Sequence, residues 1–169
     1  MRAAKRLGDD DVAIVKACAA VKGDSNKALA KLNDVPESSR GDLGYVLCRV
    51  KWAMKKDKIV EAAKLIVAAA PETMAQQDTD EWWRDRRTIS RKLLDMGEFQ
   101  LAFDVVKDAA TPTLEAYRAD YAFMPGWIAM RYLNDPATAR KYFADIDKGL
   151  SNPITLARAN YWRARAEEA

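Results

Sequence analysis

A turn followed by an alanine recurs along this chain, and this pattern constrains the fold more than any other feature. The instances are Gly23-Asp24 with Ala28 and Leu32, Asp57 with Ala62 and Ile66, Gly97-Glu98 with Ala102 and Val106, and Asn134-Asp135 with Ala139 and Phe143. Successive alanines lie 34, 40 and 37 residues apart, close to the periods of repeats in which one helical hairpin needs neighbours to cover its apolar face. We therefore expect an all-α fold, a right-handed superhelix of stacked antiparallel helical hairpins resembling a tetratricopeptide solenoid.

The residues between these turns also follow helical periodicity, and no useful stretch alternates with period two, so no sheet is expected. Asp78 with Glu81 three residues later fits a capping box, and Gly97 suits a left-handed helix terminus. Polar residues before proline predict three helix starts, at Thr111-Pro112, Asp135-Pro136 and Asn152-Pro153. We expect residues 1–169 to form one superhelical segment whose last helix lacks a partner, as in a truncated part of a larger protein.

Composition excludes several classes of function. The chain has no histidine, which removes Ser-His-Asp and Cys-His catalysis and every His-ligated metal site. The net charge of +3 is spread along the chain, so nucleic-acid binding has little electrostatic support. No apolar run approaches the roughly 20 residues that span a bilayer, and the start of the chain is not a signal peptide. We expect no metal, no cofactor, no nucleic-acid partner and no membrane span.

The two cysteines, Cys18 and Cys48, fall in apolar faces of separate predicted helices and form no CxxC pair. Such a pattern does not indicate zinc or redox chemistry. We expect two buried, reduced side chains that pack as small hydrophobes. A disulfide between adjacent repeats is the alternative.

The second half of the chain carries a distinctive order of motifs. These are Trp83-x-x-x-Arg87-x-x-x-Arg91, Gly97 with Ala102-Phe103, Gly126-Trp127-Ile128-Ala129-x-Arg131-x-Leu133, Asn152-Pro153-Ile154 and Ala157-Arg158-Ala159-x-Tyr161-Trp162-x-x-Arg165-Ala166. Together they resemble the helical superhelix of soluble lytic murein transglycosylases. The resemblance implies a periplasmic scaffold that precedes a lysozyme-like domain and meets peptidoglycan glycan strands through the parent enzyme.

The resemblance implies no catalytic residue in this chain. The family's signature is a Glu-Ser pair followed by a Gly-Leu-Met-Gln segment, and this chain has only Glu37-Ser38 without that segment. A general acid needs a raised pKa and a sheltered pocket, whereas Glu37 lies in a loop rich in proline and serine. We expect the parent protein to cleave peptidoglycan and this segment not to.

Candidate substrate-binding residues combine cationic and flat aromatic side chains, namely Arg87, Arg91, Trp127, Tyr161, Trp162 and Arg165. Aromatic rings can stack on sugars, and guanidinium groups can hold anions. The default interpretation of each is structural: a solvated, self-paired face for the basic run from Arg84 to Lys92, and buried packing for the aromatic residues.

Two other functions fit a helical repeat protein. The main alternative is a free-standing tetratricopeptide-like adaptor that binds a peptide or protein partner on its concave face. RNA binding through arginine-rich repeats is a weaker third hypothesis.

Overall fold

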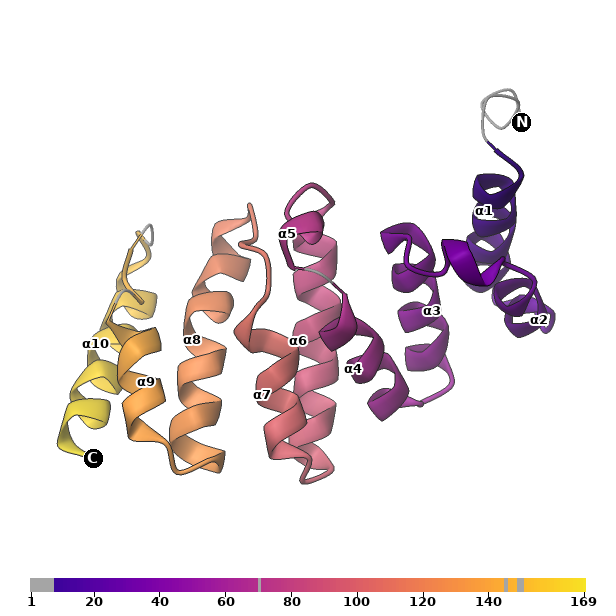
Figure 1. Ribbon diagram of the computed structural model, residues 1–169. Coiled ribbons are helices and arrows are strands. Elements are labelled where there is room, and N and C mark those ends of the chain that lie inside the picture. Colours follow the sequence, from indigo (N-terminus) through magenta and orange to yellow (C-terminus); the bar gives the residue numbers. More distant parts are fainter. Residues whose placement is uncertain (1–7, 70, 145, 149–150) are drawn as a thin grey trace. The chain divides into compact units, whose positions relative to one another are not determined.

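The computed structural model describes residues 8–69, 71–144, 146–148 and 151–169, and this part of the chain is helical with no strand (Figure 1). It divides into two compact units, Met1–Ala70 and Pro71–Ala169. The N-terminal unit contains α1 (Asp9–Lys22), α2 (Ala28–Asn33), a short 3-10 turn (Glu37–Ser39), α3 (Leu43–Lys55) and α4 (Ile59–Ala68). The C-terminal unit contains α5 (Pro71–Met74), α6 (Thr79–Asp95), α7 (Phe99–Lys107), α8 (Glu115–Tyr132), α9 (Pro136–Phe143) and α10 (Pro153–Glu168).

The helices pair as hairpins at the four places where the sequence predicts turns. α1 packs on α2, α3 on α4, α6 on α7, and α8 on α9. Among the described residues, positive φ angles occur at Asp24 (51°), Asp57 (54°), Gly97 (80°) and Asn134 (51°). A left-handed residue after a helix reverses the chain, and glycine, asparagine and aspartate reach it at the lowest cost. The predicted turns are confirmed.

The repeated alanines are buried, each on the second helix of its hairpin. Ala28 is 3% exposed, and Ala62, Ala102 and Ala139 are fully buried. The apolar residues that follow them, Leu32, Ile66, Val106 and Phe143, are also fully buried. A small residue at this position allows two helix backbones to approach closely, so the recurring alanine marks the contact inside each hairpin.

The expectation of two reduced cysteines is wrong. Cys18 on α1 and Cys48 on α3 form a disulfide, with their Cα atoms 5.3 Å apart. Packing of α1 on α3 brings the two positions together, and both are only half-buried. The bond links the two hairpins of the N-terminal unit, which is the alternative that the sequence left open.

Side-chain caps begin several helices of the C-terminal unit. Asp78 accepts a hydrogen bond from the Glu81 amide (3.0 Å) at α6, and Asp135 accepts one from Thr138 (2.9 Å) at α9. Asn152 accepts from the amides of Ile154 and Thr155 at α10. These three predicted starts are confirmed.

The start predicted at Thr111-Pro112 is wrong, because α8 begins at Glu115. The two residues before α8 are held by another helix: Asp80 on α6 accepts hydrogen bonds from the amides of Thr113 (2.8 Å) and Leu114 (3.1 Å). The Thr113 hydroxyl also donates to Asp80 and is the main cause that lowers the pKa of this carboxyl. A partner 33 residues away in sequence thus sets the position of α8.

The basic run on α6 is only partly the solvated face that the sequence predicts. Arg84 pairs with Glu81 at 3.4 Å, as expected for neighbours on one helical face. Asp85 and Arg86, however, are buried. The Arg86 guanidinium donates to the Val105 carbonyl of α7, and burial lowers its pKa to about 10. Arg86 therefore holds α6 against α7.

Aromatic rings fill the space where α8, α9 and α10 meet. Phe123 stacks on Trp127 and on Phe143, each with ring centroids 6.1 Å apart, and meets the edge of Trp162 at 5.9 Å. Gly126 on α8 lies against the Phe143 ring so closely that a Cβ there would come within 2.7 Å of it. This core fixes the face of α8 that carries the candidate site.

Candidate functional site

The candidate site is a pair of adjoining pockets in the C-terminal unit, between residues of α6, α8 and α10. Asp120 on α8 and Arg158 on α10 line both pockets. The larger one, which we call the polar pocket, has a volume of about 610 Å³ and also contains Glu115, Ser151 and Asn152. The smaller one, the aromatic pocket, has a volume of about 380 Å³ and is walled by Phe123, Trp127 and Tyr132.

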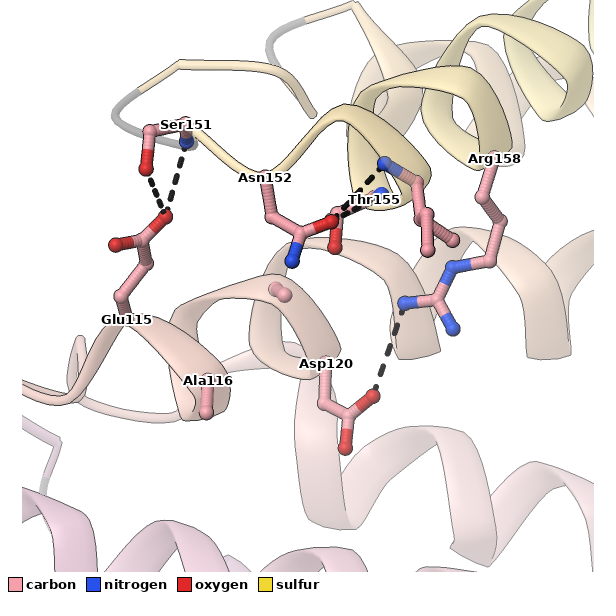
Figure 2. Close-up of a pocket in the computed structure, with 9 residues that line it drawn as sticks. Glu115, Ala116, Asp120, Ser151, Asn152, Thr155 and Arg158 are labelled. Atoms are coloured by element: carbon pink, nitrogen blue, oxygen red, sulfur yellow. Dashed lines mark hydrogen bonds and ion pairs between the residues drawn. The ribbon is translucent and has the colours of Figure 1, made fainter.

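The polar side chains of the polar pocket hold the local structure together. Glu115 accepts hydrogen bonds from the amide (2.9 Å) and the hydroxyl (2.7 Å) of Ser151, as Figure 2 shows. These bonds, the backbone bond first, lower the pKa of Glu115. Asn152 is occupied in capping α10. Glu115 is thereby held ionised, which suits an anchor for the start of α10 and not a proton donor.

Asp120 is the electrostatic centre of the site. Its carboxylate lies 2.8 Å from Arg87 Nη1, 3.7 Å from Arg91 Nη2 and 3.8 Å from Arg158 Nη2. Arg87 and Arg91 are one turn apart on α6, so the two side chains reach the same carboxylate. Asp95 also lines the aromatic pocket, so three guanidinium groups and two carboxylates leave a local surplus of one positive charge.

The three guanidinium groups are not equivalent. Arg87 makes the short hydrogen bond to Asp120, and its side chain is only 25% exposed. Arg91 and Arg158 lie beyond hydrogen-bond distance of Asp120, and their side chains are 58% and 42% exposed. Arg87 therefore serves the structure, while Arg91 and Arg158 face solvent at the rim of the aromatic pocket.

Aromatic contacts fix the position of Arg158. Its guanidinium carbon lies 4.3 Å from the ring centroid of Phe123, within the range of a cation–π interaction. Trp127 and Tyr132 meet edge to face at 5.2 Å and complete the wall of the pocket. Asp95 also lines this pocket. The pocket therefore has two cations, Arg91 and Arg158, and two anions, Asp95 and Asp120, and Arg87 is paired with Asp120.

The structure brings together three of the six residues proposed from the sequence. Arg87, Arg91 and Trp127 gather around Asp120 and the aromatic pocket. Trp162 packs on Phe123 at 5.9 Å, and Tyr161 meets the edge of Trp162 at 5.5 Å while remaining exposed. Arg165 pairs with Glu168 at 3.1 Å and lines neither of these pockets.

Two contributors, Asp120 and Phe123, belong to none of the motifs found in the sequence. Arg158 belongs to the Ala157-Arg158-Ala159 motif of the sequence but is not among the six residues proposed from it. In the structure it packs on Phe123 and also lines the two pockets.

The arrangement fits binding of an anionic ligand better than acid–base catalysis. The pKa of Glu115 is lowered, whereas a catalytic acid requires a raised pKa. The Asp120 carboxylate is engaged in the ion pair with Arg87. Glu37 is exposed and lies in the N-terminal unit. The described residues contain no group of three or more side chains suited to hold a metal ion.

None of the helices in the described ranges is both long and apolar enough to cross a membrane.

Comparison of the chain with protein-family models, curated proteins and solved structures finds no match. The fold and the site are those of a helical-hairpin protein in which the polar pocket and the aromatic pocket adjoin and form one groove lined by arginine and aromatic side chains.

Proposed function

We propose that this chain is a non-catalytic scaffold segment of a periplasmic soluble lytic murein transglycosylase. In this proposal the hairpins stack into a right-handed superhelix, and the parent enzyme cleaves peptidoglycan with a separate lysozyme-like domain. The segment binds and positions glycan strands. The observation that carries the proposal is the groove of the C-terminal unit, in which guanidinium groups and aromatic rings line one pocket.

The chemistry of the groove matches that of a peptidoglycan strand. Sugar rings have apolar faces that stack on flat aromatic side chains such as Trp127, and the strand also carries carboxylates that pair with guanidinium groups. Neither Asp120 nor Glu115 has the environment of a proton donor. The groove thus supports recognition of the polymer without its cleavage.

The disulfide supports a location outside the cytoplasm. Disulfides persist in oxidising compartments such as the bacterial periplasm and are rare where thiols are kept reduced. Cys18 and Cys48 are half-buried and lie on separate helices, so the bond is placed as a structural crosslink. A periplasmic protein would retain it.

The test is cosedimentation of the purified chain with insoluble peptidoglycan, followed by analysis of the soluble products. We expect the chain to sediment with the polymer and to release no anhydro-muropeptides. Absence of binding would contradict the proposed function. Release of products that Glu37→Gln abolishes would contradict the absence of catalysis.

A free-standing tetratricopeptide-like adaptor is the second candidate function. It is favoured by exposed apolar side chains on α10, where Ile154 is 81% exposed and Tyr161 is 59% exposed. The two residues are seven positions apart and so lie on one face of α10, a spacing that fits contact with an apolar surface of a protein partner. The reading frame of the full gene separates the two functions, because a scaffold segment continues into a lysozyme-like domain with a Glu-Ser motif and an adaptor does not.

A further inference from the structure

We infer that the aromatic pocket is a subsite for a sugar that carries a carboxylate, with Arg91 and Arg158 as the residues that bind the carboxylate. This inference rests on the proposed function and makes it specific to one pocket and one chemical group. The carboxylate of the ligand lies between the two guanidinium groups, and the sugar ring lies against Trp127 and Tyr132.

The first step of the argument is the availability of the two guanidinium groups. Within the described part of the chain, the guanidinium groups of Arg91 and Arg158 donate no hydrogen bond, and their contacts with Asp120 at 3.7 and 3.8 Å are ionic. Arginine carries five N–H donors in a planar fork that matches a carboxylate. Both forks therefore have donors for a ligand.

The second step is that these groups are already held in place. Asp120 attracts both, Phe123 lies under Arg158 at 4.3 Å, and Arg87 binds Asp120 at 2.8 Å and so fixes the carboxylate itself. Two side chains that are positioned before binding lose less conformational freedom on binding. Asp120 carries the same negative charge as the carboxylate of the ligand, so its role is to position the two arginines and not to bind the ligand.

The third step is the shape of the pocket. A volume of about 380 Å³ lies at the small end of the range for ligand pockets and suits one or two sugar rings. Trp127 and Tyr132 supply aromatic surface beside the two cations. A carboxylate attached to a ring satisfies both features at once, whereas a neutral sugar leaves the guanidinium groups unused and a free peptide leaves the aromatic wall unused.

The experiment measures the affinity of the full chain for a peptide-free peptidoglycan tetrasaccharide by NMR titration. The comparison ligands are the same tetrasaccharide with its carboxylates reduced to alcohols and the free stem peptide. We expect Arg91→Gln and Arg158→Gln each to weaken binding of the carboxylated sugar by about 10- to 100-fold, the range for loss of charge-assisted hydrogen bonds. Reduction of the carboxylates should weaken binding to wild-type protein by a similar factor.

The matched control is Arg84→Gln, which removes an exposed arginine of α6 that lines neither pocket. We expect the affinity of this variant to stay within about twofold of wild type, since the substitution removes only a surface ion pair. Arg91 is the more exposed of the two binding arginines, so its variant tests the site even if Arg158→Gln unfolds.

Three outcomes would overturn the subsite: equal affinity for the carboxyl-reduced sugar, wild-type affinity in Arg91→Gln, or tighter binding of the free stem peptide. If the wild type still sediments with insoluble peptidoglycan, such a result refutes the subsite alone. If it does not sediment, the proposed function fails as well.

Discussion

Removal of the Cys18–Cys48 disulfide should destabilise the N-terminal unit strongly. The bond joins residues 30 apart in sequence. In the chain-entropy relation, closing a loop of this length lowers the entropy of the unfolded chain by an amount worth roughly 3.7 kcal/mol at 25 °C. Both cysteines are half-buried, so replacing them by alanine removes little packing. The loss of stability should therefore come mainly from loss of the crosslink.

The perturbation is the double substitution Cys18→Ala and Cys48→Ala, compared with chemical reduction of the wild type. For a unit of about 70 residues, 1 kcal/mol moves the thermal midpoint by roughly 4–8 °C, so the midpoint of the N-terminal unit should fall by about 15–30 °C. Circular dichroism gives the midpoint, and hydrogen exchange followed by mass spectrometry assigns it to residues 9–68 or to residues 71–169.

The control is built into the comparison of the two perturbations. A reducing agent should reproduce the effect of the double substitution in the wild type and have no effect on the variant. The reasoning is refuted if reduction leaves the wild-type midpoint unchanged, or if the loss of protection falls mainly in residues 71–169.

Three further predictions concern the C-terminal unit. Gly126→Ala should destabilise it, because the added Cβ would lie 2.7–3.0 Å from atoms of the buried Phe143 ring. The overpacking costs about 1–3 kcal/mol, which offsets or exceeds the roughly 1 kcal/mol that alanine gains over glycine in a helix. Urea unfolding measures the net change in the free energy of unfolding. Asp120→Asn should cost about 1.5–3 kcal/mol by weakening the charged hydrogen bond to a partly buried arginine, and a double-mutant cycle with that arginine isolates the term. The hydrogen bond from the Thr113 hydroxyl is the main cause that lowers the pKa of Asp80 in the folded state. The stability that the ionised Asp80 contributes is therefore complete above the ordinary pKa of 3.8 and is lost as the pH falls below that value. Asp80→Asn should flatten the acid limb of a curve of unfolding free energy recorded from pH 7 to pH 2.

Each of these predictions has a matched control or an excluding result. Gly41→Ala meets no atom within 4 Å, so it should leave stability unchanged, and an equal loss in Gly41→Ala and Gly126→Ala would remove the steric explanation. A coupling energy near zero between Asp120 and Arg87 would show that their contact contributes nothing. An acid limb that is identical in the wild type and in Asp80→Asn would show that this contact carries no pH dependence.

The helices and turns were predictable because their signals are local. A left-handed residue, an alanine and an apolar residue follow one another within about ten residues, and together they mark a hairpin. The caps at Asp78, Asp135 and Asn152 likewise act within three residues of their own positions.

The remaining features depend on contacts between distant segments. The start of α8 depends on Asp80 of α6, 33 residues earlier, and Thr111-Pro112 shows the local pattern of a start without being one. The disulfide required α1 and α3 to pack with their cysteines facing each other. The cluster around Asp120 is formed by side chains from three helices. The sequence indicated only those members that also belong to an arginine and aromatic motif, namely Arg87, Arg91 and Trp127.

The packing of each helix on the next within a unit also bears on how the chain acquires its structure. Contacts between segments close in sequence give a low contact order, which is associated with folding in microseconds to milliseconds. In the N-terminal unit, α1 and α3 pack on each other directly. Rapid packing of α1 on α3 would bring the two thiols together before oxidation. The disulfide would then form between cysteines that helix packing had already placed next to each other.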